Sequence, residues 1–288
     1  MAVLERPPKA SPVRDPTVRD PAVLPLPRQD GPLMSGAAVA WELLLFAMAT
    51  LSAIVTPPYN WIPEFIDQAW ILLKRATIPA AACAFGFGYG APGLQGSAFA
   101  ESFGDVNRVA AILGAATIRE QAVWVTGMVV AGVIGTAICA DLGARKIRDE
   151  LNAMSVMGVD AMRRMVAPRV LAITLLMPAV GLLVMFVEYY AIELAYLAYG
   201  GTNGGFKEAA AYSYSAIDIY TFFIKTLVVG FIVGIVCCFK GMNASGGSRG
   251  VGRAVNQAVV MSFVLVWVLN YAFNSTYLAL FPQALSLR

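Results

Sequence analysis

The sequence predicts an all-α integral membrane protein, and three observations support this fold class. Hydrophobic residues make up 58% of the chain and charged residues only 14%, whereas charged residues make up about 25% of a soluble domain. Several apolar runs are long enough for a helix of about 20 residues, the length that crosses a bilayer. The basic residues gather in clusters between these runs. We therefore expect one membrane domain with much of its surface in lipid.

The composition argues against several functional classes. The chain has no histidine, which removes the commonest metal ligand and the usual proton shuttle. Its four cysteines lie in apolar runs and are expected to be small core residues rather than disulfide or metal partners. The two Gly-rich stretches, residues 85–96 and 241–254, lack the Gly-Lys-Ser/Thr of a phosphate-binding loop. Without these groups we expect that the chain is not an enzyme and binds no cofactor itself. Its net charge of only +3 is too small to suggest a nucleic-acid partner.

The N-terminal part of the chain is expected to lie outside the bilayer core. Residues 1–36 are rich in proline and lack the apolar run of a signal peptide, which predicts a disordered cytoplasmic tail. Residues 37–56 are long enough to span, but they contain Glu42 and are followed by two prolines. The next residues mix charged and aromatic side chains, as interfacial segments do. We therefore assign residues 37–75 to the membrane interface.

Five apolar runs come next along the chain, and each is predicted to cross the bilayer. They occupy residues 77–100, 109–140, 166–198, 216–239 and 254–281. Basic clusters lie in the N-terminal tail, between spans two and three, and between spans four and five. By the positive-inside rule all three clusters are cytoplasmic. A further crossing by residues 37–56 would leave one cluster outside, so five spans are preferred, with the N-terminus inside and the C-terminus outside.

Charged residues within the spans are the first candidates for function. They are Arg119, Glu120, Glu188, Glu193 and Lys225. Charges at membrane depth are costly and usually face a partner or a wet cavity. A structural ion pair and a role in substrate binding or gating are equally compatible with each of them. Span two also carries small residues at four-residue spacing, which predicts a closely packed central helix.

The segment between spans two and three is charged and amphipathic. We predict a helix over about residues 143–165, with a bend after Met157 because Gly158 and Asp160 come next. Its apolar face recurs near helical spacing and consists of Leu151, Met154, Met157, Met162 and Met165. Such a face can lie on the membrane surface or in a groove of a soluble partner protein. The residues alone leave both possibilities open.

Two motifs resemble the MlaE/YrbE permease family. Residues 140–172, ADLGARKIRDELNAMSVMGVDAMRRMVAPRVLA, are similar to its signature of an acidic residue and Gly, Glu before a methionine-containing segment, Met-Gly-Val-Asp, and Pro-Arg. Residues 239–260, FKGMNASGGSRGVGRAVNQAVV, resemble its Gly-rich loop before the last helix. Both motifs fall on loops that their charge assigns to the cytoplasm. The resemblance implies a permease domain over residues 37–288, with an N-terminal interfacial helix, five spans and a cytoplasmic coupling helix.

The resemblance also implies partners. The proline-rich tail makes the chain similar to an actinobacterial, for example mycobacterial, YrbE subunit of a Mce lipid importer in the inner membrane, with a periplasmic C-terminus. Its partners would be a second YrbE-type permease subunit, a cytoplasmic MceG-type ATPase that binds ATP and Mg, and a periplasmic assembly of Mce proteins. The substrate would be a fatty acid or a related long-chain lipid. An ATP-independent secondary transporter or channel, and a non-transporting scaffold of the Mce assembly, are the alternatives.

Two sets of site residues are implied by this resemblance. The ATPase would contact the coupling helix through Arg145, Arg148, Glu150, Met154, Met157, Gly158, Asp160, Arg163 and Arg164. A lipid cavity on the outer side would be lined by Phe85, Phe87, Tyr89 and Leu94. Glycines interrupt the span there, and irregular backbone at membrane depth is tolerated only where it faces protein or a cavity.

Overall fold

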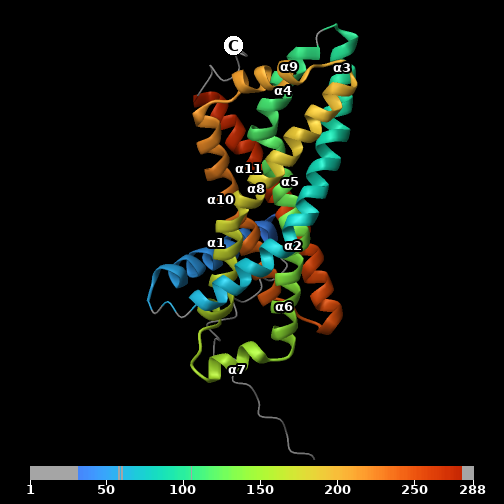
Figure 1. Ribbon diagram of the computed structural model, residues 1–288. Helices are drawn as coiled ribbons and strands as arrows, with labels where there is room; N and C mark the ends of the chain where they lie inside the picture. The colour runs from blue at the N-terminus through green and yellow to red at the C-terminus, as the bar shows by residue number, and fades with distance from the viewer. Residues whose placement is uncertain (1–31, 58, 60, 105, 281–288) are drawn as a thin grey trace, which may run out of the picture. The chain divides into compact units, whose positions relative to one another are not determined.

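The computed structural model describes residues 32–57, 59, 61–104 and 106–280 (Figure 1). Most of the predicted disordered tail and the C-terminal residues 281–288 lie outside the described residues. The chain divides into two compact units, Met1–Glu42 and Leu43–Arg288, and all five predicted spans belong to the second unit. Within the described part, the secondary structure is entirely helical and contains no strand. This confirms the predicted all-α class.

The helices succeed one another with short connections, and η marks a π-helical turn. In chain order they are α1 (Pro32–Val55), α2 (Ile62–Gly88), η1 (Tyr89–Gln95), α3 (Gly96–Ser102), α4 (Val106–Ala116), η2 (Thr117–Gln121), α5 (Ala122–Val129), η3 (Val130–Gly135), α6 (Thr136–Ile147), α7 (Glu150–Val156), η4 (Met162–Val166), α8 (Ala167–Ala198), α9 (Asn203–Ser213), α10 (Ala216–Met242) and α11 (Gly247–Leu280).

Among the described residues, six helical stretches are long and apolar enough to cross a membrane. They are Gly36–Val55, Ile62–Ser102, Ala110–Ile147, Met162–Ala198, Ala216–Met242 and Gly247–Leu280. The last five contain most of each predicted span. The first lies in α1, which is predicted to lie in the interface. Length and apolar composition are compatible with either position, so the interfacial assignment of α1 stays a prediction.

The start of the first span differs from the prediction. Residues 62–75 are predicted to belong to the interfacial segment, but they form the first half of α2, which continues through Arg75 to Gly88. Pro63 stands in the first turn of this helix, where proline is favoured because its fixed φ suits a helix and its missing N–H is not needed. No further proline occurs until Pro79. The helix of span one therefore begins well before the apolar run does.

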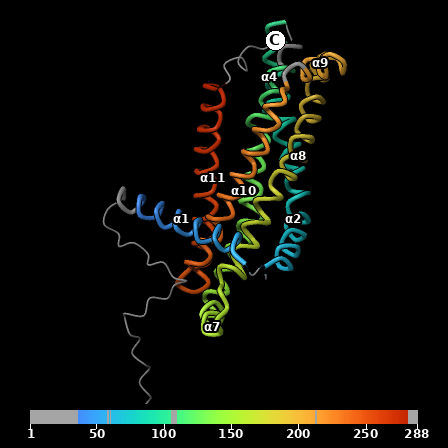
Figure 2. The backbone as a smooth tube through the Cα atoms, turned by 90° about the vertical axis from the view of Figure 1, so that its left-hand side faces the viewer, coloured from blue at the N-terminus to red at the C-terminus, as the bar shows by residue number. Residues whose placement is uncertain are grey.

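Span two and span four form the centre of the bundle. The most apolar windows of Ala110–Ile147 and Ala216–Met242 are each 67% buried, against 22% for Gly247–Leu280. α8 lies against α2 and α10, and α10 lies against α6 and α11 (Figure 2). A Cβ on Gly135 would lie 2.5 Å from the Cys237 sulfur, so only glycine permits this approach of η3 to α10. The predicted central position of span two agrees with this packing.

Three of the four cysteines behave as expected. Cys139, Cys237 and Cys238 are buried, whereas Cys83 is exposed on α2. All four are free thiols among the described residues. The expectation of small core residues is therefore wrong only for Cys83, which faces outward because its helix buries a different stripe, at Ala76, Ala80 and Ala84.

Candidate functional site

The loop between α6 and α8 consists of two short helices instead of one. The helix predicted over about 143–165, with a bend after Met157, is wrong in its extent, because α6 ends at Ile147, α7 covers only Glu150–Val156 and η4 begins at Met162. Asp149 has a φ of 58° and Gly158 a φ of 74°. Both lie in the left-handed region, which ends a right-handed helix and turns the chain. The bend expected after Met157 is confirmed by Gly158, whereas no sequence pattern indicates the turn at Asp149.

Three of the predicted coupling residues hold α7 to the end of α6. Arg145 pairs with Asp141 at 3.1 Å (Nε–Oδ2) and with Glu150 at 3.5 Å (Nη1–Oε2). Arg148 pairs with Glu150 at 2.7 Å (Nε–Oε1). Such partly exposed pairs contribute only about 0–1 kcal/mol each to stability. Their main effect is to fix the direction in which α7 leaves the bundle.

Two more predicted coupling residues fasten the other end of the loop. Arg163 donates from Nη2 to the Thr56 hydroxyl at 2.8 Å and from Nη1 to the Pro57 carbonyl at 3.0 Å. The Asp160 carboxylate accepts from the Met162 backbone N–H at 2.9 Å. It also lies 3.7 Å from the Arg163 Nε. Arg163 therefore binds within the protein, and Arg164 is exposed beside it.

The exposed apolar surface of the loop is smaller than the sequence pattern predicts. Leu151 is buried, and Met154, Met162 and Met165 are half-buried against the protein. Met157 remains 70% exposed, beside Val156 at 88% and Val159 at 39%. We call Val156, Met157 and Val159 the α7 tip, which lies at one end of the bundle (Figure 1). Sequence reasoning missed the two valines because they lie outside the helical spacing of the methionines.

A polar network lies within the membrane-spanning helices, toward the opposite end of the bundle. Arg119 on η2 donates to Asp218 on α10 twice, at 2.8 Å (Nε–Oδ1) and 3.2 Å (Nη2–Oδ2). Asp218 also accepts from the Tyr277 hydroxyl of α11 at 2.6 Å and from the Ser215 backbone N–H at 3.0 Å. A charged pair with this two-bond geometry is among the stronger hydrogen-bonded contacts in proteins.

The network continues through Lys225. Its Nζ donates to the Arg119 backbone carbonyl at 2.6 Å and to the Asn274 side-chain carbonyl at 2.7 Å. The Asn274 amide in turn donates to Glu120 Oε1 at 2.5 Å. The structure thus joins the predicted residues Arg119, Glu120 and Lys225. A cavity of about 10 Å³ lies among these side chains, which is roughly the space of one water molecule.

Sequence reasoning missed Asp218, Asn274 and Tyr277. A signal for Asp218 was present, because Ser215 and Asp218 form a capping box at the start of α10. Asn274 and Tyr277 are three residues apart and so share one face of α11. Their pairing with residues of other helices was not visible in the sequence.

The two remaining predicted charges lie apart from this network. Glu193 on α8 lies 3.7 Å from Lys207 on α9 (Oε1–Nζ). Glu188 is fully buried, and neither of its carboxylate oxygens has a hydrogen-bond partner among the described residues. It packs on Gly88 of α2, where an added Cβ would lie 2.8 Å from Glu188 Cγ. Buried polar groups without partners are uncommon in native proteins.

The four residues of the predicted lipid cavity lie around the junction of α2 and η1. Phe85 and Tyr89 stack with ring centroids 5.8 Å apart, and Phe87 packs edge-on against Trp124 at 4.7 Å. Leu94 is half-buried within the π-helical turn. Gly93 allows close contact with Ala195 of α8, since an added Cβ would lie 2.7 Å from the Ala195 Cβ. The irregular backbone therefore faces protein, and the lipid cavity at these residues stays a prediction.

These features define an α-helical, multi-pass membrane protein with paired charges between its spans and an apolar tip outside them. A model of the family described as Permease MlaE matches residues 65–276. The chain belongs to the MlaE permease family.

Individual relatives agree with this assignment. A probable ABC transporter permease protein of Rickettsia typhi is 26% identical over 211 residues, covering 72% of this chain and 80% of the relative. The intermembrane phospholipid transport system permease protein MlaE of Haemophilus influenzae is 27% identical over 164 residues, covering 55% and 62%. The chloroplastic protein TRIGALACTOSYLDIACYLGLYCEROL 1 of Arabidopsis thaliana is 30% identical over 145 residues, covering 50% and 41%.

Proposed function

We propose that this chain is the membrane-spanning permease subunit of an ABC-type lipid transporter and that a separate ATPase drives it. Support for the transporter class comes from family membership and from relatives named as ABC transporter permeases. Support for a lipid substrate comes from a relative named as a phospholipid transport permease. ATP and Mg would bind to the partner ATPase and not to this chain.

The observation that carries the proposal is the α7 tip. Val156 and Met157 are 88% and 70% exposed, although an isolated apolar side chain gains about 1.5–3 kcal/mol when it is fully buried. Methionine adapts its shape to apolar grooves, and a short helix laid in a groove is a common mode of protein recognition. We infer that the ATPase provides this groove.

The contacts around the tip suit the transmission of force. Arg145 and Arg148 fix the first turn of α7 to α6, and Arg163 fixes the returning chain to Thr56 and Pro57. A displacement of the tip would therefore act on the ends of several long helices together. At the other end, the Arg119–Asp218 pair joins η2 to α10, so these helices would move together or exchange partners between two states.

The finer proposal concerns the partners and the direction. We propose an inner-membrane complex of two YrbE-type permease subunits, an MceG-type ATPase and a periplasmic Mce assembly, which imports fatty acids or related long-chain lipids. The basic clusters support a cytoplasmic N-terminus and α6–α8 loop, with a periplasmic C-terminus. The proline-rich N-terminal residues support the Mce-type subunit.

The experiment is co-purification of the ATPase with the full chain and its partner subunit. Met157→Glu is expected to reduce recovery of the ATPase at least tenfold, because a charge would enter an apolar groove. Ser248→Glu is the matched control, since it adds the same charge to an exposed position in the first turn of α11, within the other basic cluster. Unchanged ATPase recovery with Met157→Glu would contradict the coupling role of the tip.

Transport assays in the same complex separate the alternatives. Lipid uptake that continues without the ATPase would indicate a secondary transporter or channel. An assembled complex with ATPase bound but no lipid movement would indicate a scaffold. Uptake that requires both ATP and an intact tip is the result expected from a permease.

A further inference from the structure

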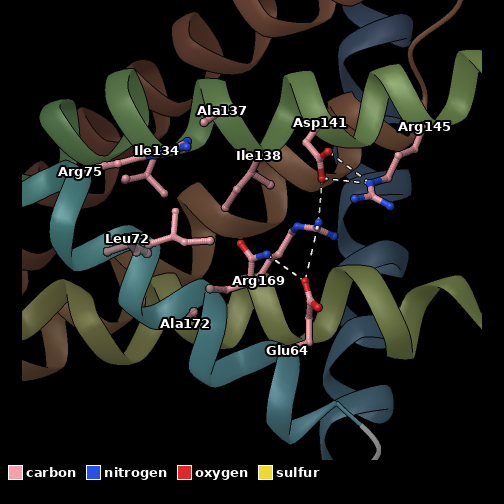
Figure 3. A pocket seen from close by; sticks show the side chains of 12 residues that line it. Glu64, Leu72, Arg75, Ile134, Ala137, Ile138, Asp141, Arg145, Arg169 and Ala172 are labelled. Atoms are coloured by element: carbon pink, nitrogen blue, oxygen red, sulfur yellow. Dashed lines mark hydrogen bonds and ion pairs between the residues drawn. The ribbon is translucent and has the colours of Figure 1, made fainter.

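A second cavity, of about 310 Å³, lies between α2, α6 and α8 (Figure 3). Its lining includes Asp141 and Arg145, which lie in the last turns of α6 before α7. Its walls are partly apolar and include Leu72, Ile134 and Ile138. Charged groups stand at both of its ends (Figure 3). They comprise three arginines and two carboxylates, namely Arg75, Arg145, Arg169, Glu64 and Asp141. The lining therefore carries a formal charge of +1.

At one end of the cavity the charges compensate one another. Arg169 is only 3% exposed and lies 2.7 Å from Asp141 (Nη2–Oδ2) and 3.9 Å from Glu64 (Nη2–Oε1). Arg169 also donates to the Met165 carbonyl at 2.8 Å. Asp141 additionally pairs with Arg145. Neither carboxylate is left without a cation, so this end does not strongly repel an anion.

At the other end, Arg75 lacks such compensation. Figure 3 shows its side chain extending from α2 toward Ile134 and Ala137, away from Glu64 and Asp141. Arg75 is exposed, and within the described ranges no ion pair or hydrogen bond holds its guanidinium. Ile134 and Asp141 are seven positions apart along the helix, which corresponds to about 10 Å at 1.5 Å per residue. Arg75 thus lies farther from the α7 loop than the compensated cluster does.

We propose that this cavity binds the phosphate of a glycerophospholipid headgroup from the cytoplasmic leaflet, with Arg75 as the phosphate ligand. The inference rests on the proposed permease function and on its cytoplasmic α7 loop. Charged side chains in spans pair or face a wet cavity, and basic pockets between helices on the cytoplasmic side bind anionic headgroups. Arginine suits this role because its planar fork can make two hydrogen bonds to phosphate.

The size of the cavity decides which part of the lipid enters. Small-molecule pockets occupy roughly 300–1,000 Å³, and 310 Å³ is at the lower end of that range. A headgroup fits this space, whereas a complete lipid with two acyl chains does not. The chains would remain in the bilayer while the headgroup enters between α2 and α6. Leu72 and Ile138 would pack against its carbon atoms.

The test is native mass spectrometry of the full chain in detergent micelles, titrated with phosphatidylglycerol. Arg75→Gln is expected to reduce the fraction with tightly bound phosphatidylglycerol about tenfold. Lys74→Gln is the matched control, because Lys74 is the neighbouring cation and lies over the Trp70 ring at 4.5 Å instead of lining the cavity. The control is expected to keep lipid binding within about twofold.

A second variant keeps the charge and fills the space. Ala137 lines the cavity and is half-buried, so Ala137→Phe is expected to reduce lipid binding without removing a cation. If Arg75→Gln does not fold, Ala137→Phe alone tests whether the cavity binds the lipid. Unchanged binding with Ala137→Phe would overturn the proposal, and so would equal losses with Arg75→Gln and Lys74→Gln.

Competition identifies the source of the phosphate. Inorganic phosphate at millimolar concentration is expected to leave the lipid bound, and displacement would show a site for a soluble anion, which overturns the lipid assignment. ATPase recovery with Arg75→Gln is measured in parallel. If Arg75→Gln leaves lipid binding unchanged and also leaves ATPase recovery and ATP-driven uptake unchanged, only the headgroup site is rejected. Loss of ATP dependence in the unaltered complex would reject the permease function itself.

Discussion

Asp218 and Glu188 are both buried carboxylates in long apolar helices, but their surroundings differ. Asp218 accepts hydrogen bonds from Arg119, Tyr277 and Ser215, which come from different parts of the chain. Glu188 has no hydrogen-bond partner for either oxygen among the described residues. Asp218 joins three helices, whereas Glu188 packs closely against Gly88 of a neighbouring helix.

The difference shows that burial alone does not define a role. A buried charge that is paired becomes strongly destabilising only when one partner is removed. A buried carboxyl group without partners already bears its desolvation cost in the native state. Substitutions at Asp218 should therefore have large effects, and polar substitutions at Glu188 should have small ones.

The largest effect is expected for Asp218→Ala. The change removes the Asp218 carboxylate from the Arg119 guanidinium, whose side chain is only 22% exposed, and breaking a largely buried ion pair from one side costs about 3–5 kcal/mol. Thermal unfolding of the purified chain in detergent measures the loss. The double variant Arg119→Leu/Asp218→Ala should recover part of it, because the pair is then removed together. Additive losses in the double variant would contradict a direct pairing.

Lys225→Met is expected to have the next largest effect. It removes the hydrogen bonds of the ammonium group to the Arg119 carbonyl and to Asn274. Because the desolvation cost of the buried ammonium is removed with them, the net loss is expected to be about 1.5–3 kcal/mol, the value of one charged hydrogen bond. The same unfolding assay measures the change. A loss of unfolding free energy smaller than that of Asp218→Ala but larger than that of Glu188→Gln would support the contrast between the paired and the unpaired carboxylate. No loss at all would show that Lys225 is not essential to the network.

Gly88→Ala tests the contact beside Glu188. The added Cβ would lie 2.8 Å from Glu188 Cγ and 3.0 Å from the Glu188 backbone oxygen, and overpacking of this kind costs about 1–3 kcal/mol. Gly86→Ala is the matched control, since nothing lies within 4 Å of its added Cβ. Equal unfolding temperatures for the two variants would mean that α2 and α8 do not pack as closely as the structure shows.

The smallest effect is expected for Glu188→Gln. The amide keeps the shape of the side chain, and no hydrogen bond to a described residue is lost. The change in unfolding free energy should stay below about 1 kcal/mol, within the range of substitutions that break no partner. A loss as large as that of Lys225→Met would reveal a partner for Glu188 and remove its contrast with Asp218.

The sequence by itself determined the features that depend on local properties. Hydropathy over about 20 residues located the five later spans, because crossing a bilayer requires a continuous apolar helix. Clustered arginines and lysines identified the loops, and Gly158 correctly marked a turn, since glycine adopts its φ of 74° without a steric cost. The family motifs lay on the same two loops.

Only the tertiary structure decided what depends on contacts between distant residues. Arg119 and Asp218 are 99 positions apart in the sequence, and no local pattern indicates that two such residues will pair. The same reason explains why Met157 is exposed while Met162 and Met165 are partly covered, although all three looked alike in the sequence. Helical periodicity selects a face, but the packing of other helices determines whether that face remains accessible.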